Sequence, residues 1–355
     1  MSARVLVAMS GGVDSSVAAA LLVEQGHEVI GVTMRLAGSG SRCCSLDDVE
    51  DARRVARRLG IRFYVADYAD DFRREVMESF ADAYLAGRTP IPCVACNGRF
   101  KFHRLVARAR ALGADAVATG HYARTERDPA TGAVALLRGA DPAKDQSYFL
   151  FDLGPAQLAH ARFPVGVLDK AEVRARARAL GLATADKPES MEICFVPDGD
   201  YAAVVEALRP GAAPGPGEVV DEAGRTLGRH PGVHRFTVGQ RRGLDVALGR
   251  RVYVKALDAA RNRVVVAPRE GLGAGGARLS GTRWVAGAPP PAPVRAQVRV
   301  RHRHAGAGAC VEPAPEGAAT VRFDAPVEAV TPGQAAVFYD GERVLGGGWI
   351  EEALA

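Results

Sequence analysis

A turn rich in glycine and serine near the start of the chain has the composition of a phosphate-binding loop. Residues 10–16, Ser-Gly-Gly-Val-Asp-Ser-Ser, lie between an apolar run and a segment with helical periodicity. Two glycines let the backbone turn tightly and present its N–H groups, and the start of a helix favours an anion. The alternative is an ordinary turn in which Ser15 caps the helix. Its position after the first strand favours the phosphate site, because ligands bind at the carboxyl ends of parallel strands.

Two better-known nucleotide motifs do not fit this chain. The Walker loop requires a lysine directly after its last glycine, whereas the first lysine here is Lys101. Residues 271–276 satisfy the pattern G-x-G-x-x-G. No helical pattern follows them, however, and no acid stands about 20 residues further on, as the dinucleotide fingerprint requires. We therefore interpret residues 271–276 as a loop.

The cysteines are the second group of residues suited to chemistry. The chain has six: Cys43, Cys44, Cys93, Cys96, Cys194 and Cys310. Cys93 and Cys96 have the C-x-x-C spacing of zinc sites, iron–sulfur clusters and redox pairs, whereas Cys194 stands alone among apolar neighbours. A second C-x-x-C is missing, so a four-cysteine zinc site is disfavoured. Clustered thiols in an intracellular chain indicate catalysis or metal binding, and a buried inert thiol is the alternative for Cys194.

The segments that must position these residues alternate between strand and helix over the first 208 residues. Strands are expected at residues 4–9, 28–34, 62–66 and 115–119, and helices at residues 15–25, 46–59, 70–85, 100–112, 170–180 and 201–208. Repeated strand–helix units predict an α/β domain with a doubly wound parallel sheet, covered by helices on both faces.

The composition of the sequence changes at residues 209–220, which are rich in proline and glycine. This change indicates a domain boundary. Beyond this point, short strand-sized runs occur at residues 235–238, 251–256, 263–267, 294–300, 320–323, 335–338 and 343–345. Such spacing predicts two small β-barrel domains. We therefore expect domains at residues 1–208, 209–282 and 283–355.

Length, composition and charge limit the class of protein. The chain has 355 residues, of which 48% are hydrophobic and 25% charged, so two or three globular domains are expected and disorder is excluded. The net charge of +5 hides a basic window at residues 225–303, which holds 17 Lys or Arg and three acids. This window predicts a polyanionic partner. The alternative is a solvated arginine-rich surface, because only five of the 46 cations are lysine. Neither a signal peptide nor a membrane span is apparent, so a cytoplasmic monomer is expected.

Read together, the motifs resemble one family. Residues 10–16 resemble the PP-loop of the ATP pyrophosphatase superfamily, whose members adenylate a substrate oxygen. The chain as a whole resembles the tRNA-specific 2-thiouridylases, which place sulfur on the wobble uridine of tRNA. The motifs are SGGVDSS at 10–16, GRTPIPCVACN at 87–97, ATGHYAR at 118–124, KDQSYFL at 144–150, FPVG at 163–166, EICFV at 192–196, TVGQRRGL at 237–244 and VTPGQAAVFYDGERVLGGGWI at 330–350.

The resemblance implies a fold, two ligands and a reaction. The fold is that of an adenine nucleotide alpha hydrolase-like domain followed by β-barrels. ATP, with Mg²⁺ held by Asp14, would adenylate the uracil oxygen at ring position 2. The residues implied to bind ATP are Ala8, Met9, Ser10, Gly11, Gly12, Val13, Asp14, Ser15, Met34 and Gly120. Cys194 matches the cysteine that carries a persulfide loaded by a sulfur-relay protein, and Cys96 matches the cysteine that attacks this persulfide.

The resemblance also implies where tRNA binds. The residues matching the target-base region are Ile91, Pro92 and Cys93. Those matching other tRNA contacts are Lys144, Asp145 and Gln146, together with Arg301 and His302 in the last domain.

One departure from the family pattern leaves the route of sulfur open. The best-known pattern has a single cysteine just before the asparagine, matched by Cys96, whereas this chain adds Cys93. Cys93, Cys96 and Cys194 could hold a [4Fe–4S] cluster with one open iron, although the persulfide route is favoured. Two further alternatives are another PP-loop adenylating enzyme, and a tRNA-binding or iron–sulfur protein that keeps the ATP fold for regulation.

Overall fold

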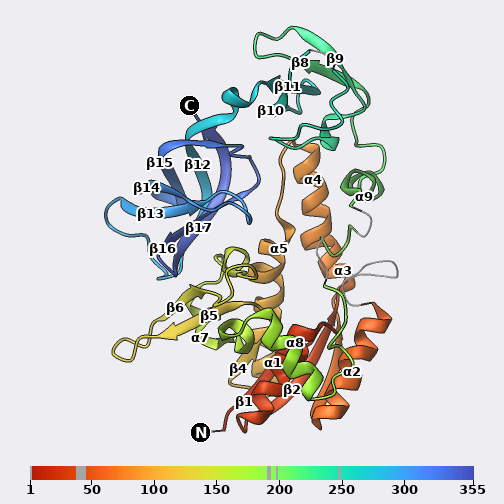
Figure 1. Ribbon diagram of the computed structural model, residues 1–355, viewed down its shortest axis with the longest axis vertical. Helices are drawn as coiled ribbons and strands as arrows, with labels where there is room; N and C mark the ends of the chain where they lie inside the picture. Colours follow the sequence, from red (N-terminus) through yellow and green to blue (C-terminus); the bar gives the residue numbers. More distant parts are fainter. Residues whose placement is uncertain (1, 37–44, 190–192, 197–198, 247–248) are drawn as a thin grey trace.

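Three units make up the chain in the computed structural model, which describes residues 2–36, 45–189, 193–196, 199–246 and 249–355. An α/β domain and a small β-sheet domain lie at opposite ends of the molecule, and a β-barrel lies to one side (Figure 1). No helix within these ranges has the length and apolar character needed to cross a membrane. Cys43 and Cys44 lie outside the described residues.

A five-stranded parallel sheet forms the centre of the α/β domain. Its strand order is β3-β2-β1-β4-β7, and every neighbouring pair is parallel. The strands are β1 (Arg4–Ala8), β2 (Glu28–Arg35), β3 (Arg62–Asp67), β4 (Ala116–Ala118) and β7 (Ala161–Arg162). The chain moves outward from β1 to β3 and then returns to the other side of β1 at β4. The switch point of this order, where α/β proteins bind ligands, therefore lies between β1 and β4.

Helices cover both faces of the sheet, as the sequence pattern predicts. The helices are α1 (Val13–Glu24), α2 (Leu46–Leu59), α3 (Ala69–Phe72), α4 (Ser79–Leu85), α5 (Pro92–Ala95), α6 (His103–Ala111), α7 (Pro155–His160), α8 (Lys170–Ala179) and α9 (Tyr201–Leu208). One apolar cluster gathers α1, α2 and α8 on one face. A second, richer in aromatic residues, gathers α3 to α6 on the other. α2 and α8 each begin with a capping box, at Ser45 and Asp169. These polar residues precede the apolar pattern and fix the start of each helix.

Two helices expected from the sequence contain π-helical turns. Residues 69–85 form α3, the π-helical η1 (Arg73–Glu78) and α4. The helix expected at residues 100–112 begins earlier, as α5, the π-helical η2 (Cys96–Phe102) and α6. Within this second segment Cys96 is the first residue of the π-helical part. Such turns occur frequently at functional sites.

The middle domain is a four-stranded mixed sheet of order β10-β11-β8-β9. Its strands are β8 (Gly217–Val220), β9 (Thr226–His230), β10 (Tyr253–Asp258) and β11 (Arg263–Ala267). The strand predicted at residues 235–238 is wrong, because a short 3-10 turn, η5 (Val233–Arg235), precedes a stretch without strand structure. Buried Val233 and Phe236 face the apolar cluster of this domain from that stretch, so their apolar character reflects burial rather than strand pairing.

The last domain is a six-stranded antiparallel barrel that β12 and β17 close by pairing with each other. Its strands are β12 (Gly273–Trp284), β13 (Val294–Arg299), β14 (Ala307–Ala314), β15 (Ala318–Glu328), β16 (Ala335–Asp340) and β17 (Arg343–Leu354). The barrel therefore begins about ten residues before the boundary expected after residue 282. The loop predicted at residues 271–276 is also wrong from Gly273 onward. A Cβ at Gly275 or Gly276 would collide with the backbone of Ala355 or Val321, so the glycines permit close strand packing.

A hairpin of the α/β domain extends the barrel sheet. Strands β5 (Ala123–Arg127) and β6 (Val134–Arg138) pair with each other, and β6 also pairs with the start of β17. The first and last domains therefore share one continuous sheet. The remaining short elements are η3 (Ser147–Phe149), η4 (Pro164–Val167), η6 (Arg269–Leu272) and η7 (Pro315–Gly317).

Candidate functional site

The glycine–serine loop lies at the carboxyl end of β1, beside the switch point of the sheet. Ser10 donates its backbone N–H to the Ser15 hydroxyl at 3.2 Å, and the hydroxyls of Ser15 and Ser16 donate to the carbonyl of Gly12 at 3.1 and 2.8 Å. Gly11 has a φ of +74°, and a Cβ there would collide with the backbone of Asp48. The loop is thus held in a conformation that requires glycine.

A cavity of about 220 Å³ opens between this loop and the end of β4. Seven of the ten residues that the sequence implies for ATP line it, namely Ala8, Met9, Ser10, Asp14, Ser15, Met34 and Gly120. Gly11, Gly12 and Val13 form the turn and the start of α1 instead. A Cβ at Gly120 would lie 2.5 Å from the backbone nitrogen of Ser15. Only glycine therefore lets the segment after β4 approach the start of α1.

Asp14 has a basic and a phenolic partner that sequence reasoning missed. The Lys170 ammonium lies 2.7 and 2.9 Å from the two carboxylate oxygens of Asp14, and the Tyr122 hydroxyl donates to Asp14 at 2.7 Å. Burial and the neighbouring Asp14 carboxylate raise the pKa of Tyr122, so the phenol keeps its proton. Lys170 comes from the first residue of α8. The fold therefore brings a lysine to a loop whose own sequence contains none.

Lys187 anchors the other side of the loop. Its ammonium donates to the Gly11 carbonyl at 3.1 Å, to Asp48 at 2.6 Å and to Asp51 at 2.5 Å. Burial lowers the pKa of Lys187, but the hydrogen bonds to Asp48 and Asp51 outweigh this and raise it overall. One ammonium group thus connects the glycine–serine loop with α2. Lys187, which supplies it, lies on the segment that precedes Cys194.

His121 contributes a neutral ring to the cavity. Its Nδ1 lies 2.7 Å from the Thr119 hydroxyl, and burial together with the charge of Lys101 lowers the pKa of His121 to about 3. The imidazole is therefore uncharged at neutral pH. It can donate a hydrogen bond to a ligand or accept one, but it does not supply a positive charge.

The predicted sulfur-transfer cysteines lie in and against one apolar core. Cys96 is buried in the aromatic-rich cluster of the α/β domain, and Cys194 is half-buried against the same cluster. Next to Cys194, Phe195 is buried and meets Phe72 and Phe80 edge-on. Cys93 is exposed, on the same helical segment as Cys96. Among the residues that the structure describes, no three His, Cys, Asp or Glu side chains are grouped as metal ligands.

The helical segment that begins at Cys96 also contacts the cavity and the barrel. Lys101, Phe102 and Leu105 of this segment line the 220 Å³ cavity. At its start, Gly98 lies against Asp152, a buried carboxyl that faces Arg283 of β12 with 2.7 Å between charged atoms. Burial outweighs the arginine charges and raises the pKa of Asp152. The helix therefore joins the predicted nucleotide cavity, the thiol and the barrel.

The three neighbouring side chains implied to contact tRNA point to three different places. Lys144 forms an ion pair with Glu189 at 2.6 Å. Asp145 is buried and accepts hydrogen bonds from the backbone of Gly139 and Ser147 and from Arg299. Gln146 accepts from the backbone of Tyr122 and lines the predicted nucleotide cavity. Asp145 in particular supports the loop rather than an exposed surface.

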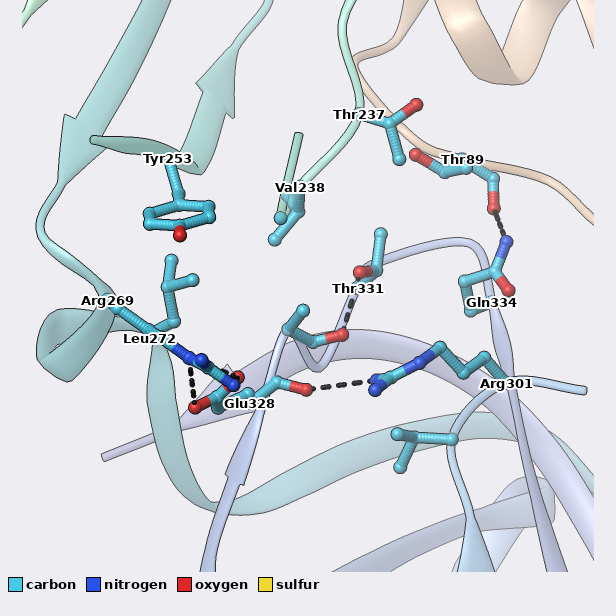
Figure 2. A pocket seen from close by; sticks show the side chains of 13 residues that line it. Thr89, Thr237, Val238, Tyr253, Arg269, Leu272, Arg301, Glu328, Thr331 and Gln334 are labelled. Atoms are coloured by element: carbon cyan, nitrogen blue, oxygen red, sulfur yellow. Dashed lines mark hydrogen bonds and ion pairs between the residues drawn. The ribbon is translucent and has the colours of Figure 1, made fainter. Parts of the chain in front are cut away.

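Arg301 and His302 also diverge. The His302 ring packs against Phe149 at an interplanar angle of 34°, with 4.5 Å between centroids, and its Nε2 lies 3.3 Å from the Asp145 carbonyl oxygen. Arg301 instead reaches across a second cavity, of about 520 Å³, and donates to the Glu328 carbonyl at 3.1 Å (Figure 2). All three domains line this junction cavity, with Thr89 from the first and Tyr253 from the second. Ile91 is half-buried and Pro92 buried, just after Thr89 in sequence.

Most of the basic window is neutralised by acids elsewhere in the chain. Nine of its cations form ion pairs with acids outside the window, for example Arg263 with Glu218 and Arg295 with Asp324. Seven exposed arginines of the window have no acidic partner within the described parts of the chain: Arg229, Arg241, Arg242, Arg250, Arg251, Arg301 and Arg303. Positive charge available to a polyanion is therefore concentrated on the middle domain and one edge of the barrel.

Lys101, Lys170 and Lys187 were missed as site residues, whereas Lys144 was predicted as a tRNA contact. The composition carried a signal, because only five of the 46 cations are lysine. Lys101 lines the predicted nucleotide cavity, Lys170 and Lys187 contact the glycine–serine loop, and Lys144 shares Glu189 with Lys170. Lysine supplies a compact point charge that arginine does not. The scarcity of lysine was evident from the sequence, whereas its gathering at one site required the fold.

Family models match the chain in three parts. They are described as the tRNA methyl transferase HUP domain at residues 3–198, the tRNA methyl transferase PRC-barrel domain at residues 207–268, and the aminomethyltransferase beta-barrel domain at residues 275–350.

Relatives of the whole chain are similar in both length and sequence. The chain is 52% identical to the tRNA-specific 2-thiouridylase MnmA of Magnetococcus marinus, over 98% of each chain. It is 53% identical to the protein of the same name from Rhodospirillum centenum, over 99% of this chain and 92% of the relative. Among solved structures, that of a 4-thiouridine synthetase–RNA complex with bound ATP is similar over 59% of this chain and 51% of that chain, with 18% identity and a TM-score of 0.39.

Replacing Lys187 should destabilise the protein in a pH-dependent way. Lys187→Met leaves Asp48 and Asp51 without their ammonium partner, so we expect the free energy of unfolding at neutral pH to fall by about 1–3 kcal/mol. Burial raises the pKa of Asp51, but hydrogen bonds from Lys187 and Arg54 lower it below its usual 3.8. A carboxyl group whose pKa is lower in the folded protein than in the unfolded chain stabilises the fold at pH values above its usual pKa of 3.8. This contribution is lost as the pH falls through the lowered pKa. The difference from wild type should therefore shrink at about pH 3.

Urea unfolding at the two pH values measures this difference, with Lys255→Met as the matched control. Lys255 pairs with Glu222 in an exposed ion pair, so its replacement should change the free energy of unfolding by less than about 0.5 kcal/mol. Equal losses for the two variants would show that Lys187 does not anchor the loop.

Proposed function

Since this chain belongs to the tRNA-specific 2-thiouridylase family, we propose that it replaces the oxygen at ring position 2 of the wobble uridine with sulfur, in an ATP-dependent reaction. One observation carries the proposal. The helical segment that begins at Cys96 lines the cavity next to the glycine–serine loop, through Lys101 and Phe102. One helical segment therefore carries the Cys96 thiol and also lines the candidate nucleotide site. This is the arrangement that a reaction coupling activation of the uridine to sulfur transfer requires.

The residues around the small cavity fit an adenine nucleotide. Backbone N–H groups at the start of α1 would hold phosphate, and Gly120 lets the cavity form beside them. Mg²⁺ is usually bound by one or two carboxylates together with substrate phosphates, and Asp14 is the carboxylate that fits. Bound ATP would supply an adenylyl group to the uracil oxygen, making that oxygen a leaving group. The neutral His121 and the protonated Tyr122 would contribute hydrogen bonds without changing charge.

Two cysteines account for the transfer of sulfur. Half-buried Cys194 would carry the persulfide, where a sulfur-relay protein can reach it, and buried Cys96 would act from the core. The terminal sulfur of the Cys194 persulfide attacks ring carbon 2. Cys96 then attacks the Cys194 sulfur, the S–S bond to the terminal sulfur breaks, and AMP leaves. The Cys96–Cys194 disulfide is reduced by two electrons from a thiol reductant. In the alternative, Cys96 attacks first and releases hydrogen sulfide as the nucleophile.

An iron–sulfur route is the second candidate, because Cys93 adds a third thiol to Cys96 and Cys194. In that route the three thiolates would hold a [4Fe–4S] cluster whose open iron binds sulfide. The exposure of Cys93 fits this role less well than a core position would. The whole-chain relatives support thiolation over the other adenylating or purely regulatory functions.

The substrate tRNA would bind across the unpaired arginines. Arg241 and Arg242 of the middle domain and Arg301 of the barrel are exposed. Arg301 lines the junction cavity, and Arg241 and Arg242 follow its lining residues 237–239 closely in sequence. Ile91, Pro92 and Cys93 would lie near the target base, since they precede Cys96 on its helix. We assign Asp145 and His302 to the support of this surface, because Asp145 is buried and the His302 ring packs against Phe149.

Replacing the cysteines one at a time should separate the two routes. Cys194→Ser and Cys96→Ser should each abolish transfer of labelled sulfur to tRNA in the presence of ATP and a persulfide donor, because each thiol forms a bond in the reaction. Cys93→Ser should retain transfer under the persulfide route and lose it under the cluster route. Cys310→Ser, in the barrel, is the matched control. Normal transfer by Cys194→Ser would refute the assignment of the sulfur carrier.

Iron analysis gives an independent readout. Anaerobically purified enzyme should contain no stoichiometric iron or acid-labile sulfide while active, because the persulfide route needs neither. Colorimetric iron and sulfide assays on the active fraction test this. Iron at about four per chain, lost in Cys93→Ser, would replace the persulfide route with the cluster route.

Salt dependence should reveal which arginines bind RNA. For wild-type enzyme the logarithm of tRNA affinity should fall steeply with the logarithm of salt concentration, because phosphate contacts release counterions. The double substitution Arg241→Ala and Arg242→Ala should reduce this slope by about one to two units. Arg295→Ala, which removes an arginine already paired with Asp324, should leave the slope unchanged. Fluorescence titrations at several salt concentrations provide the slopes, and parallel lines for wild type and the double variant would remove these two arginines from the RNA surface.

A further inference from the structure

Glu189 occupies a site built from two lysines. The Lys144 ammonium lies 2.6 Å from one carboxylate oxygen of Glu189, and the Lys170 ammonium lies 2.9 Å from the other. Each oxygen thus has its own ammonium partner, and Arg174 stands 3.9 Å away. All four side chains are at most about one-third exposed. Burial raises the pKa of Glu189, but the hydrogen bonds from Lys144 and Lys170 outweigh it and lower the pKa to about 2.

The lysine pair lies where the phosphate loop, which has no lysine of its own, needs a positive charge. The loop at residues 10–16 contains no lysine, although phosphate loops commonly rely on one as a point charge. Lys170 touches Asp14, the second residue of α1, and lies in the same network as Lys144. Lys144 and Lys170 are 26 residues apart and come from different elements, so their convergence is a product of the fold. Two ammonium groups that hold one carboxylate beside a phosphate loop are equally suited to hold phosphate oxygens.

We propose that Lys144 and Lys170 form the phosphate-binding subsite for ATP, and that Glu189 is an internal anion that the phosphates displace. The proposal rests on the proposed use of ATP. Glu189 and the phosphates compete for the same two ammonium groups, so apparent affinity is reduced by the fraction of enzyme in which Glu189 holds them.

Binding calorimetry on the full chain with Mg²⁺ tests the proposal without measuring sulfur transfer. The probes are ATP and inorganic pyrophosphate, and the variants are Glu189→Gln, Lys144→Met and Lys170→Met. Glu189→Gln should bind both probes about tenfold more tightly, because the competing charge is gone. Lys144→Met and Lys170→Met should each bind pyrophosphate at least about tenfold more weakly. Asp186→Asn is the matched control, since Asp186 pairs only with Arg178 among the described residues and is exposed, and it should bind like wild type.

The outcomes separate this inference from the proposed function. Unchanged or weaker binding of both probes by Glu189→Gln, with ATP still binding to wild type, would overturn the competition and leave the function standing. Failure of ATP to bind wild type or any variant would overturn the proposed function itself. Should Glu189→Gln fail to fold, Lys144→Met decides: weaker pyrophosphate binding supports the subsite, and unchanged binding overturns it.

Discussion

The buried ion pair between Asp145 and Arg299 is the contact on which the arrangement of the domains depends. The two side chains are 4% and 10% exposed and lie 3.2 Å apart, with Asp145 on the α/β domain and Arg299 at the end of a barrel strand. Two backbone N–H groups complete the shell of Asp145. A buried charge without its partner is costly, so the loop and the barrel hold each other in place. On either side of Asp145, Lys144 then pairs with Glu189 and Gln146 lines the predicted nucleotide cavity.

The two proposed binding regions use different chemical groups. The proposed nucleotide pocket is built from backbone groups and glycines, which permit close approach, with lysines beside it that supply a compact charge. The proposed RNA surface is built from arginines on the middle domain and the barrel edge, whose planar groups suit phosphate recognition along a backbone. Cys96 lies on the helix that connects these regions, and Asp152 joins the same helix to the barrel through Arg283. The thiol is therefore held by both regions.

Local patterns in the sequence were sufficient for most of the fold and part of the site. The turn at residues 10–16 and the strand before it are contiguous, so their pattern predicted a feature that the fold then places at the switch point. Lys170 reaches Asp14 across 156 residues, and no local pattern contains such a contact. Strand runs were predicted for four of the six barrel strands, β13, β15, β16 and β17, but not for β12 or β14. The start of β12 at Gly273 was missed because glycines that permit close packing resemble loop residues. Charge counted along the chain overstated the free positive charge, since acids elsewhere in the chain neutralise about half of the cations of the basic window.

The pairing of β6 with β17 has a consequence for how the protein is made. β6 belongs to the first half of the chain, yet its partner begins at Arg343, about 200 residues later in the sequence. Until that strand leaves the ribosome, the hairpin of β5 and β6 presents an uncovered edge, which is the kind of surface that invites wrong partners. The parallel sheet of the first domain is complete without β17, but the hairpin is not fully paired until β17 is present. Loss of β17 would remove two contacts together, because its start pairs with β6 and its remainder closes the barrel on β12.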